Sequence, residues 1–264
     1  MDDELIVAAI GAVRVLRLNR SEKLNALNPA LLTALSAAFG AIEGDDTVRA
    51  VLLTGTGRGF CVGADLTQNQ GGGLRDLGAS IEQMYNPLVR RIRALDRPVI
   101  AAVNGVAAGA GVNLALAADI VLATESASFI QAFVRIGLIP DAGGTWFLPH
   151  LIGEARARGL AMTGEAISAQ QAVDWGMIWR CLPDEGFAEA AMDFAQGMAA
   201  RPTQSLAAMK RAFNQAATNT LDAQLDVERD LQRVMGRTPD FIEGVRAFIE
   251  KRPAAFTGAP PITR

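Results

Sequence analysis

The sequence is poor in the residues from which disulfide frameworks, metal centres and nucleophilic triads are built. Its two cysteines, Cys61 and Cys181, are far apart and lack the CxxC spacing of a structural zinc site. Its only histidine, His150, follows Pro149 at an expected helix end, where a capping or surface role is favoured. No Ser-His-Asp triad can be assembled without this histidine. We therefore expect neither a disulfide framework nor a metal site.

Runs of basic charge and long apolar runs are also missing. The formal net charge is −3 and the isoelectric point about 5.3, with no basic stripe of the kind that binds nucleic acid. No window approaches the roughly 18 consecutive apolar residues of a membrane-spanning helix. The N-terminal MDDELIV begins acidic and lacks the layout of a signal peptide. We expect a cytoplasmic protein that binds neither nucleic acid nor membrane.

Short apolar runs alternate with amphipathic segments over the first 200 residues, which predicts an α/β fold with strands buried on both faces. A hairpin is expected at residues 5–10 and 13–18, and buried strands at residues 49–54, 99–103, 120–123 and 177–182. Helices are expected at residues 29–43 and 80–95. From about residue 201 the pattern is helical throughout, with Pro202 and Pro239 marking helix starts.

Two loops rich in small residues follow two of these strands, residues 54–65 (TGTGRGFCVGAD) and 104–111 (NGVAAGAG). Neither has the GxGxxG spacing of a dinucleotide site or the spacing of a P-loop. Two interpretations remain. The glycines serve turns and close helix packing, or they let two backbone N–H groups from separate loops converge on one oxygen as an oxyanion hole. Such a hole suits a thioester, whose carbonyl oxygen becomes an enolate when the α-proton leaves.

One acidic side chain, Asp141, lies between an apolar run and a pair of glycines in GLIPDAGGT (residues 137–145). The plain interpretation is that Asp141 caps a helix that begins near Gly143, or that it shapes the turn. The functional interpretation is that apolar neighbours such as Ile136, Leu138 and Ile139 raise its pKa. A carboxyl group with a raised pKa is a better base near neutral pH. Both roles can coexist.

Five segments together resemble the crotonase superfamily, also called the enoyl-CoA hydratase/isomerase family, over nearly the whole chain. They are NRSEKLNALN (19–28), RGFCVGADL (58–66), RPVIAAVNGVAAGAGVNLALAADIVLAT (97–124), GLIPDAGGTWFLP (137–149) and MTGEAISAQQAVDWGMI (162–178). The resemblance implies a spiral of repeated ββα units in residues 1–200 and a helical trimerisation region in residues 201–264. It also implies a homotrimer or a dimer of trimers, and a CoA thioester as substrate, with no separate cofactor.

The resemblance also implies roles for individual residues. The N–H groups of Ala64 and Ala110 would form the oxyanion hole, and Asp141 would be the catalytic acid/base. Asp65 is expected to hold the oxyanion loop by hydrogen bonds as well as to border the ligand. The residues expected to contact the acyl group or CoA are Lys23, Asn25, Ala26, Gly63, Asp65, Leu66, Gly109, Asn113 and Phe133, with Phe248 and Lys251 reaching the CoA of an adjacent subunit.

Two departures from the family pattern bear on the reaction. Hydratases of the family use two glutamates, and Asn113 and Phe133 stand at those positions here. Adding water needs a base and an acid at a held water molecule, so efficient hydration is not expected. One carboxyl group, that of Asp141, is enough to move a proton along an acyl chain.

We therefore expect an acyl-CoA isomerase. The resemblance is closest to family members that shift 3-enoyl-CoA to 2-enoyl-CoA or rearrange the ring epoxide of phenylacetyl-CoA to an oxepin. The alternatives are an enoyl-CoA hydratase of fatty-acid β-oxidation and a dehalogenase in which Asp141 is the nucleophile. The alternative from another class is a CoA-ester-binding or RNA-binding protein without catalysis.

Overall fold

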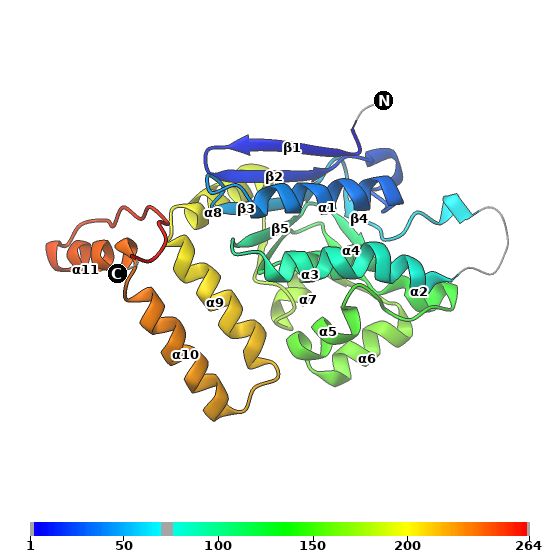
Figure 1. Cartoon of the computed structure of the whole chain (residues 1–264). Coiled ribbons are helices and arrows are strands. Elements are labelled where there is room, and N and C mark those ends of the chain that lie inside the picture. The colour runs from blue at the N-terminus through cyan, green and yellow to red at the C-terminus, as the bar shows by residue number, and fades with distance from the viewer. Residues whose placement is uncertain (1–2, 70–75, 263–264) are drawn as a thin grey trace.

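The computed structural model describes residues 3–69 and 76–262 and contains two β-sheets with helices around them (Figure 1). The larger sheet has six strands in the order β1-β2-β3-β5-β7-β10. β1 and β2 form the expected antiparallel hairpin, and the other neighbours are parallel. The strands are β1 Leu5–Ile10, β2 Val13–Leu18, β3 Ala50–Gly55, β5 Val99–Val103, β7 Ile120–Thr124 and β10 Arg180–Leu182.

The smaller sheet has four strands in the order β4-β6-β8-β9, namely β4 Gly59–Cys61, β6 Val106–Ala108, β8 Ser128–Ile130 and β9 Ala166–Ser168. Each of β3, β5 and β7 adds to the larger sheet, and the strand that follows it adds in parallel to the smaller one. A helical segment then leads back to the larger sheet. This repetition is the spiral of ββα units that the resemblance implies.

Four of the short strands were not expected from the sequence. β4 and β6 lie inside the two segments expected to be loops, and β8 and β9 lie in stretches without a strand signal. Each is only three residues long, and two of them follow glycines that disfavour strands. They form because successive turns of the spiral place them side by side, where each satisfies the backbone groups of the next.

The central strands β3, β5 and β7 of the larger sheet are largely buried on both faces, as their apolar residues predict, whereas the edge strand β1 is mostly exposed. In β5, Val99, Ala101 and Val103 belong to the cluster on one face. Ile100 and Ala102 of the same strand belong to the cluster on the other face, which α8 (Phe187–Ala199) covers with Phe187 and three alanines. The alternation follows from the two-residue period of a strand.

Helices cover the outside of the two sheets. The first, α1, begins at Pro29 as expected, and the side chain of its N-cap, Asn28, accepts the N–H of Leu31 at 2.8 Å. The helices before α8 are α1 Pro29–Glu43, α2 Leu77–Ser80, α3 Asn86–Ala94, α4 Ala110–Leu116, α5 Gly144–Ile152, α6 Glu154–Thr163 and α7 Ala169–Asp174.

The helix expected at residues 80–95 is divided into three parts. α2 runs into a π-helical turn over Ile81–Tyr85, and α3 begins at Asn86. Pro87 lacks an N–H and removes one helical hydrogen bond at this place. π-helical turns of this kind inside helices occur frequently at functional sites.

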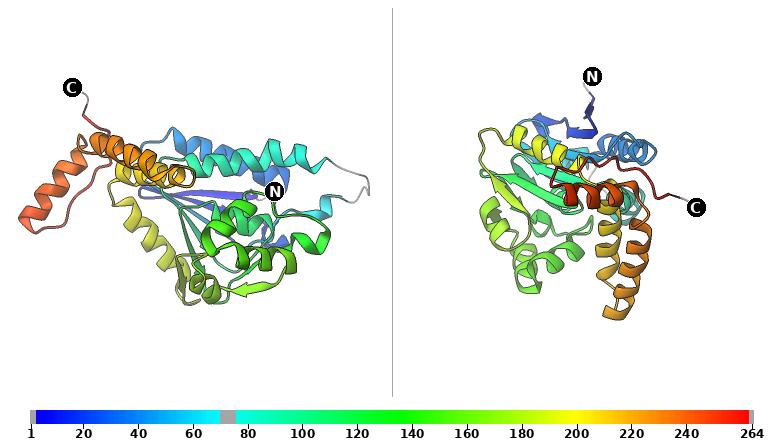
Figure 2. Two further views of the ribbon diagram at one scale, coloured as in Figure 1. Left: turned by 90° about the horizontal axis from the view of Figure 1, so that it is seen from below. Right: turned by 90° about the vertical axis from the view of Figure 1, so that its left-hand side faces the viewer.

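The C-terminal helices α9 (Thr203–Ala216), α10 (Leu221–Met235) and α11 (Pro239–Glu250) project from one end of the α/β body (Figures 1 and 2). They carry several large apolar side chains that are exposed in the single chain, among them Phe213, Leu221, Phe248 and Ile249. In the described residues, no helix is both long enough and apolar enough to cross a membrane.

A buried ammonium group fastens α9 to the α/β body. Lys210 donates hydrogen bonds to the carbonyl oxygen of Ile92 and to Asp119 Oδ2, both at 2.8 Å. Asp119 Oδ2 also accepts the N–H of Val99 at the start of β5. Burial lowers the pKa of Lys210, and the charge of Asp119 opposes this change. Through Asp119, the ion pair therefore links Val99, the first residue of β5, to the projecting helix α9.

We predict that Lys210→Met lowers the free energy of unfolding by about 3 kcal/mol, since it leaves the Asp119 carboxylate without its cation. Urea denaturation followed by circular dichroism measures this change. Arg158→Met is the matched control, because the Arg158–Glu154 pair is exposed on one helix and should contribute little. Equal effects of the two substitutions would show that the buried pair does not fasten α9.

Candidate active site

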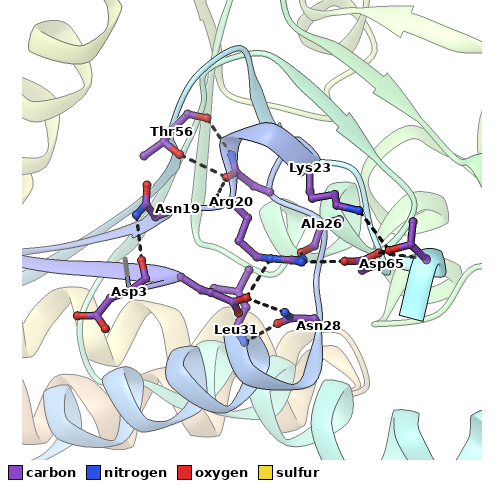
Figure 3. Close-up of polar contacts among 12 residues, drawn as sticks. Asp3, Asn19, Arg20, Lys23, Ala26, Asn28, Leu31, Thr56 and Asp65 are labelled. Carbon is purple, nitrogen blue, oxygen red and sulfur yellow. Dashed lines mark hydrogen bonds and ion pairs between the residues drawn. The ribbon is translucent and has the colours of Figure 1, made fainter. Parts of the chain in front are cut away.

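Arg20 connects the segment before α1 to Asp65, the last residue of the first glycine loop (Figure 3). Its guanidinium group is buried and donates to Asp65 Oδ2 at 2.8 Å and to the carbonyl oxygen of Ala26. Asp65 Oδ1 accepts the N–H of Thr67 at 3.1 Å and also its hydroxyl group. Hydrogen bonds from Thr67, and then from Arg20, hold the pKa of Asp65 at about 2. Asp65 thus fixes the loop by hydrogen bonds, as the sequence suggested, and its charge is fully committed.

Two asparagines hold the first part of the same loop. Asn25 is completely buried, and its Nδ2 donates to the carbonyl oxygens of Thr56 at 3.0 Å and Gly59 at 2.8 Å. Asn104, at the end of β5, accepts the Gly55 N–H at 3.0 Å. These amides fix the shape of the loop from two directions. The side-chain N–H groups of Asn25, a residue expected to contact the ligand, are therefore already hydrogen-bonded to the loop.

The two glycine loops meet at Gly63. Its φ of +85° is one that L side chains rarely adopt. A methyl group at Gly63 would lie 3.0 Å from the carbonyl oxygen of Ala108 and 3.3 Å from the nitrogen of Ala110. Only glycine allows the two backbones to come this close, so the structure brings together the two segments that the oxyanion-hole interpretation requires.

At this meeting point, the N–H groups of Ala64 and Ala110 have no hydrogen-bond acceptor within the described part of the chain. Leu27 donates to the Gly63 carbonyl oxygen at 2.7 Å and accepts from Asp65 at 2.8 Å, so the Ala64 N–H points away from Leu27. Ala110 is the first residue of α4, whose first N–H groups have no partner within the helix. Among the hydrogen bonds of the described residues, neither N–H has an acceptor.

Phe133 lies against the second loop. It is buried in the 3-10 helix Ala132–Ile136, and a methyl group at Gly109 would lie 3.8 Å from its ring. Gly109 has a φ of +53° and donates its N–H to the carbonyl oxygen of Ile130 at 2.8 Å. An apolar ring therefore borders the turn that presents the Ala110 N–H.

The Asp141 carboxyl group is partly buried, and its Oδ1 has no hydrogen-bond partner among the described residues. Burial raises its pKa from 3.8 to about 6. The helix that follows, α5, has Gly143 as its N-cap and receives no side-chain cap, so Asp141 is not a capping residue. Its backbone does shape the turn, because its carbonyl oxygen accepts the N–H of Gly144 at 2.9 Å.

The source of the burial differs from the expectation. Ile136, Leu138 and Ile139 were expected to surround Asp141, yet all three are exposed, Ile139 by 78%. These three side chains are therefore not buried around Asp141. Residues from earlier in the chain also lie near it.

Tyr85 is one of these residues, and its place near Asp141 was not expected from the sequence. It ends the π-helical turn and packs against the main core cluster. Burial raises the pKa of Tyr85, and the negative charge of Asp141 raises it further. Being the only tyrosine in the chain was the sole signal for this residue.

The remaining candidate residues lie in three different settings. Lys23 is exposed and donates to the Thr67 hydroxyl group at 3.2 Å, and Leu66 is exposed beside it. Asn113 is completely buried beneath the Asp141 turn. Phe248 (85% exposed) and Lys251 lie at the end of the projecting α11, apart from α4 and α5 (Figures 1 and 2). A single chain does not bring this last pair to Asp141.

His150 is not among the residues that form the candidate site. The ring of His150 stacks on Trp146 with the centroids 4.2 Å apart, and its Nδ1 lies 2.6 Å from the Trp146 carbonyl oxygen on the surface of α5. Within residues 3–69 and 76–262, no three His, Cys, Asp or Glu side chains gather in a way that would hold a metal ion.

The fold and the meeting of the two loops have counterparts in known proteins. A family model described as enoyl-CoA hydratase/isomerase matches residues 9–259. The chain belongs to the enoyl-CoA hydratase/isomerase family. An enoyl-CoA hydratase of known crystal structure from Bacillus anthracis has the same fold, with a TM-score of 0.92 and 34% identity over 97% of this chain and 100% of that one.

Relatives of this family member carry the names of two activities. It is 53% identical to the 1,2-epoxyphenylacetyl-CoA isomerase of Escherichia coli K12, over 93% of this chain and 95% of that one. It is 49% identical to a probable enoyl-CoA hydratase of Rhodobacter capsulatus, over 92% and 94% of the two chains. The family member is accordingly an enzyme that acts on CoA thioesters.

We predict that Asp65→Asn lowers the free energy of unfolding above pH 4, because it removes a carboxylate that Thr67 and Arg20 stabilise. The folded-state pKa of Asp65 lies below its ordinary value of 3.8, so its contribution is present above pH 3.8 and is lost as the pH falls toward about 2. The difference between wild type and variant should shrink over that range in urea titrations. A difference that does not change with pH would contradict the assignment.

Proposed function

We propose that this family member is an acyl-CoA isomerase that uses Asp141 as its single acid/base and the N–H groups of Ala64 and Ala110 as an oxyanion hole. The observation that carries the proposal is the state of the Asp141 carboxyl group. It is partly buried, it has an oxygen without a partner, and its pKa is raised to about 6. A group of this kind exchanges protons readily near neutral pH.

The proposed reaction is a proton shuttle. In a 3-enoyl-CoA, Asp141 removes a proton from the carbon next to the thioester, and the electron pair passes to the carbonyl oxygen as a dienolate. Asp141 then returns the proton to the far end of the former double bond, which leaves a 2-enoyl-CoA. Two N–H groups would bind the dienolate oxygen, and the loss of one such donor typically costs about 3 kcal/mol.

The isomerase relative extends the proposal to a second substrate class, the ring epoxide of phenylacetyl-CoA, which would be rearranged to an oxepin. The buried ring of Phe133 beside the proposed oxyanion hole supports an aromatic acyl group. The relatives named as hydratases raise water addition as the alternative. Against it stands the buried position of Asn113, whose side chain is already hydrogen-bonded, together with the apolar Phe133.

We also propose that residues 201–264 form a trimerisation region and that the active assembly is a homotrimer or a dimer of trimers. The large apolar side chains exposed on α9, α10 and α11 support this proposal. In such an assembly, Phe248 and Lys251 would reach the CoA of an adjacent subunit. Lys23, Ala26, Leu66 and the loop before Asp65 would line the remainder of its path.

We predict that Asp141→Asn reduces isomerase turnover by at least about 10³-fold while CoA-ester binding changes little, because the amide cannot accept the proton. Turnover of the wild type should rise with pH through about 6, as Asp141 loses its proton. Stopped-flow loss of a 3-enoyl-CoA gives the rate, and calorimetry with the same ester gives the affinity.

The thermal stability of the same variant is the control for its folding. The pKa of Asp141 is raised in the folded state, so its charge costs stability as the pH rises from 3.8 through about 6. Asp141→Asn removes that cost and should be at least as stable as the wild type at pH 8. Near-normal turnover in a stable Asp141→Asn protein would refute Asp141 as the base.

The substrate class is tested by comparing kcat/KM for the ring epoxide of phenylacetyl-CoA, a 3-enoyl-CoA and crotonyl-CoA. We expect conversion of the first two and only trace hydration of the third. Substantial hydration of crotonyl-CoA would favour the hydratase alternative. Unchanged recovery of all three esters, despite tight binding, would favour a binding protein without catalysis.

A further inference from the structure

The buried side chain of Asn113 is hydrogen-bonded to the turn that contains Asp141. Its Nδ2 donates to the carbonyl oxygen of Asp141 at 2.8 Å, and its Oδ1 accepts from Gln131 Nε2 at 2.8 Å. Asn113 has no exposed surface, and Gln131 is 2% exposed. The two amides therefore form a chain that runs from the end of β8, through α4, to the backbone of Asp141.

The chain requires an amide at position 113. One end of the Asn113 side chain donates a hydrogen and the other end accepts one, and a carboxylate of the same shape has no donor for the Asp141 carbonyl oxygen. The space around Asn113 is also closed. A methyl group at Gly144 would lie 2.3 Å from Asn113 Nδ2, so Gly144 and Asn113 fit against one another without room to spare.

The held turn has an unusual backbone. Ala142 has a φ of +47° and Gly143 a φ of +86°, so two successive residues adopt the left-handed region. For Ala142 this conformation is strained and persists only where surrounding structure enforces it. The hydrogen bond from Asn113 acts on the carbonyl group that immediately precedes Ala142, and it is well placed to enforce the turn.

The side-chain oxygen of Gln131 also bears on the role of Asn113 and Gln131. Gln131 Oε1 is buried and has no hydrogen-bond partner within the described residues. An unpartnered buried acceptor destabilises a fold, and Gln131 keeps one while its Nε2 donates to Asn113 Oδ1. The donor on Gln131 is thus more readily explained by its effect on Asn113 than by its effect on stability.

We infer that Asn113 and Gln131 are positioning residues, which together fix the Asp141 turn so that the carboxyl group stays unpaired and poorly solvated. This inference rests on the proposed function of Asp141. It also reassigns Asn113, which the family resemblance placed among the ligand contacts. Asn113 acts on the acid/base through the backbone and touches no substrate.

The test uses Asn113→Ala, Gln131→Met and the double variant, with a 3-enoyl-CoA as substrate. Each single variant should lower kcat by about tenfold with KM changed less than about threefold, because positioning affects the reacting geometry more than binding. The pH at which kcat/KM reaches half its maximum should move down from about 6 toward 3.8, since a loosened turn lets water reach the carboxyl group. The double variant should be no slower than Asn113→Ala, because Gln131 acts through Asn113.

Two controls separate positioning from stability. In Gln131→Met one unpartnered buried oxygen, Gln131 Oε1, is replaced by another, Asn113 Oδ1, so kcat is measured well below the Tm of this variant, where its loss cannot come from unfolding. Asp45→Ala removes the acceptor of hydrogen bonds from Arg14 and Thr47. Asp45 precedes β3 and so lies at the end of that strand opposite the first glycine loop, and the variant should lower the Tm while the pH profile of kcat/KM stays as in the wild type. A pH shift that appears in Asp45→Ala as well would overturn the inference.

The outcomes also distinguish this inference from the proposed function. If Asp141→Asn is inactive but Asn113→Ala and Gln131→Met keep the wild-type kcat and pH profile, the positioning role is wrong and the function of Asp141 stands. If the effects of the two single variants multiply in the double variant, the pair does not act as one chain. If Asp141→Asn remains active, the proposed function fails and this inference fails with it.

Discussion

The close approach of two backbone segments at Gly63 is the constraint on which the rest of the site depends. A methyl group added at Gly63 would lie 3.0–3.3 Å from backbone atoms of the second loop. The positive φ of Gly63 would also strain any residue other than glycine. Every scaffold contact described above serves this approach. Asn25 and Asn104 hold the first loop, and Arg20 with Asp65 holds its far end. Where the loops meet, the N–H groups of Ala64 and Ala110 have no acceptor among residues 3–69 and 76–262.

Two aspartates near this point show how the environment divides one side-chain type into two roles. Asp65 receives hydrogen bonds from Thr67 and Arg20, and its pKa is held at about 2. Asp141 is partly buried without a partner for Oδ1, and its pKa rises to about 6. The first is a fixed negative charge in a structural ion pair. The second can change its protonation near neutral pH, and the proposed chemistry needs that change.

The spiral explains why the site can be built from distant parts of the sequence. Each turn adds one strand to either sheet and leaves a loop at the same end, so loops 50 residues apart in sequence become neighbours. The buried Lys210–Asp119 pair then connects this body to the projecting helices. In the proposed trimer, those helices would complete a neighbour's CoA site.

The sequence by itself determined the strands and helices whose apolar periodicity is strong, and also the family, because glycines and asparagines at fixed spacing encode the two loops. The hairpin, β5, β7 and α1 are examples. Only the tertiary structure decided the three-residue strands β4, β6, β8 and β9, the π-helical turn, and the true neighbours of Asp141. The physical reason is that a short strand or a poorly solvated carboxyl group is defined by what packs against it. Tyr85 and Asn113 come from two earlier turns of the spiral, and Gln131, in the same turn as Asp141, acts on it through Asn113. The local sequence around Asp141 contains no record of these contacts.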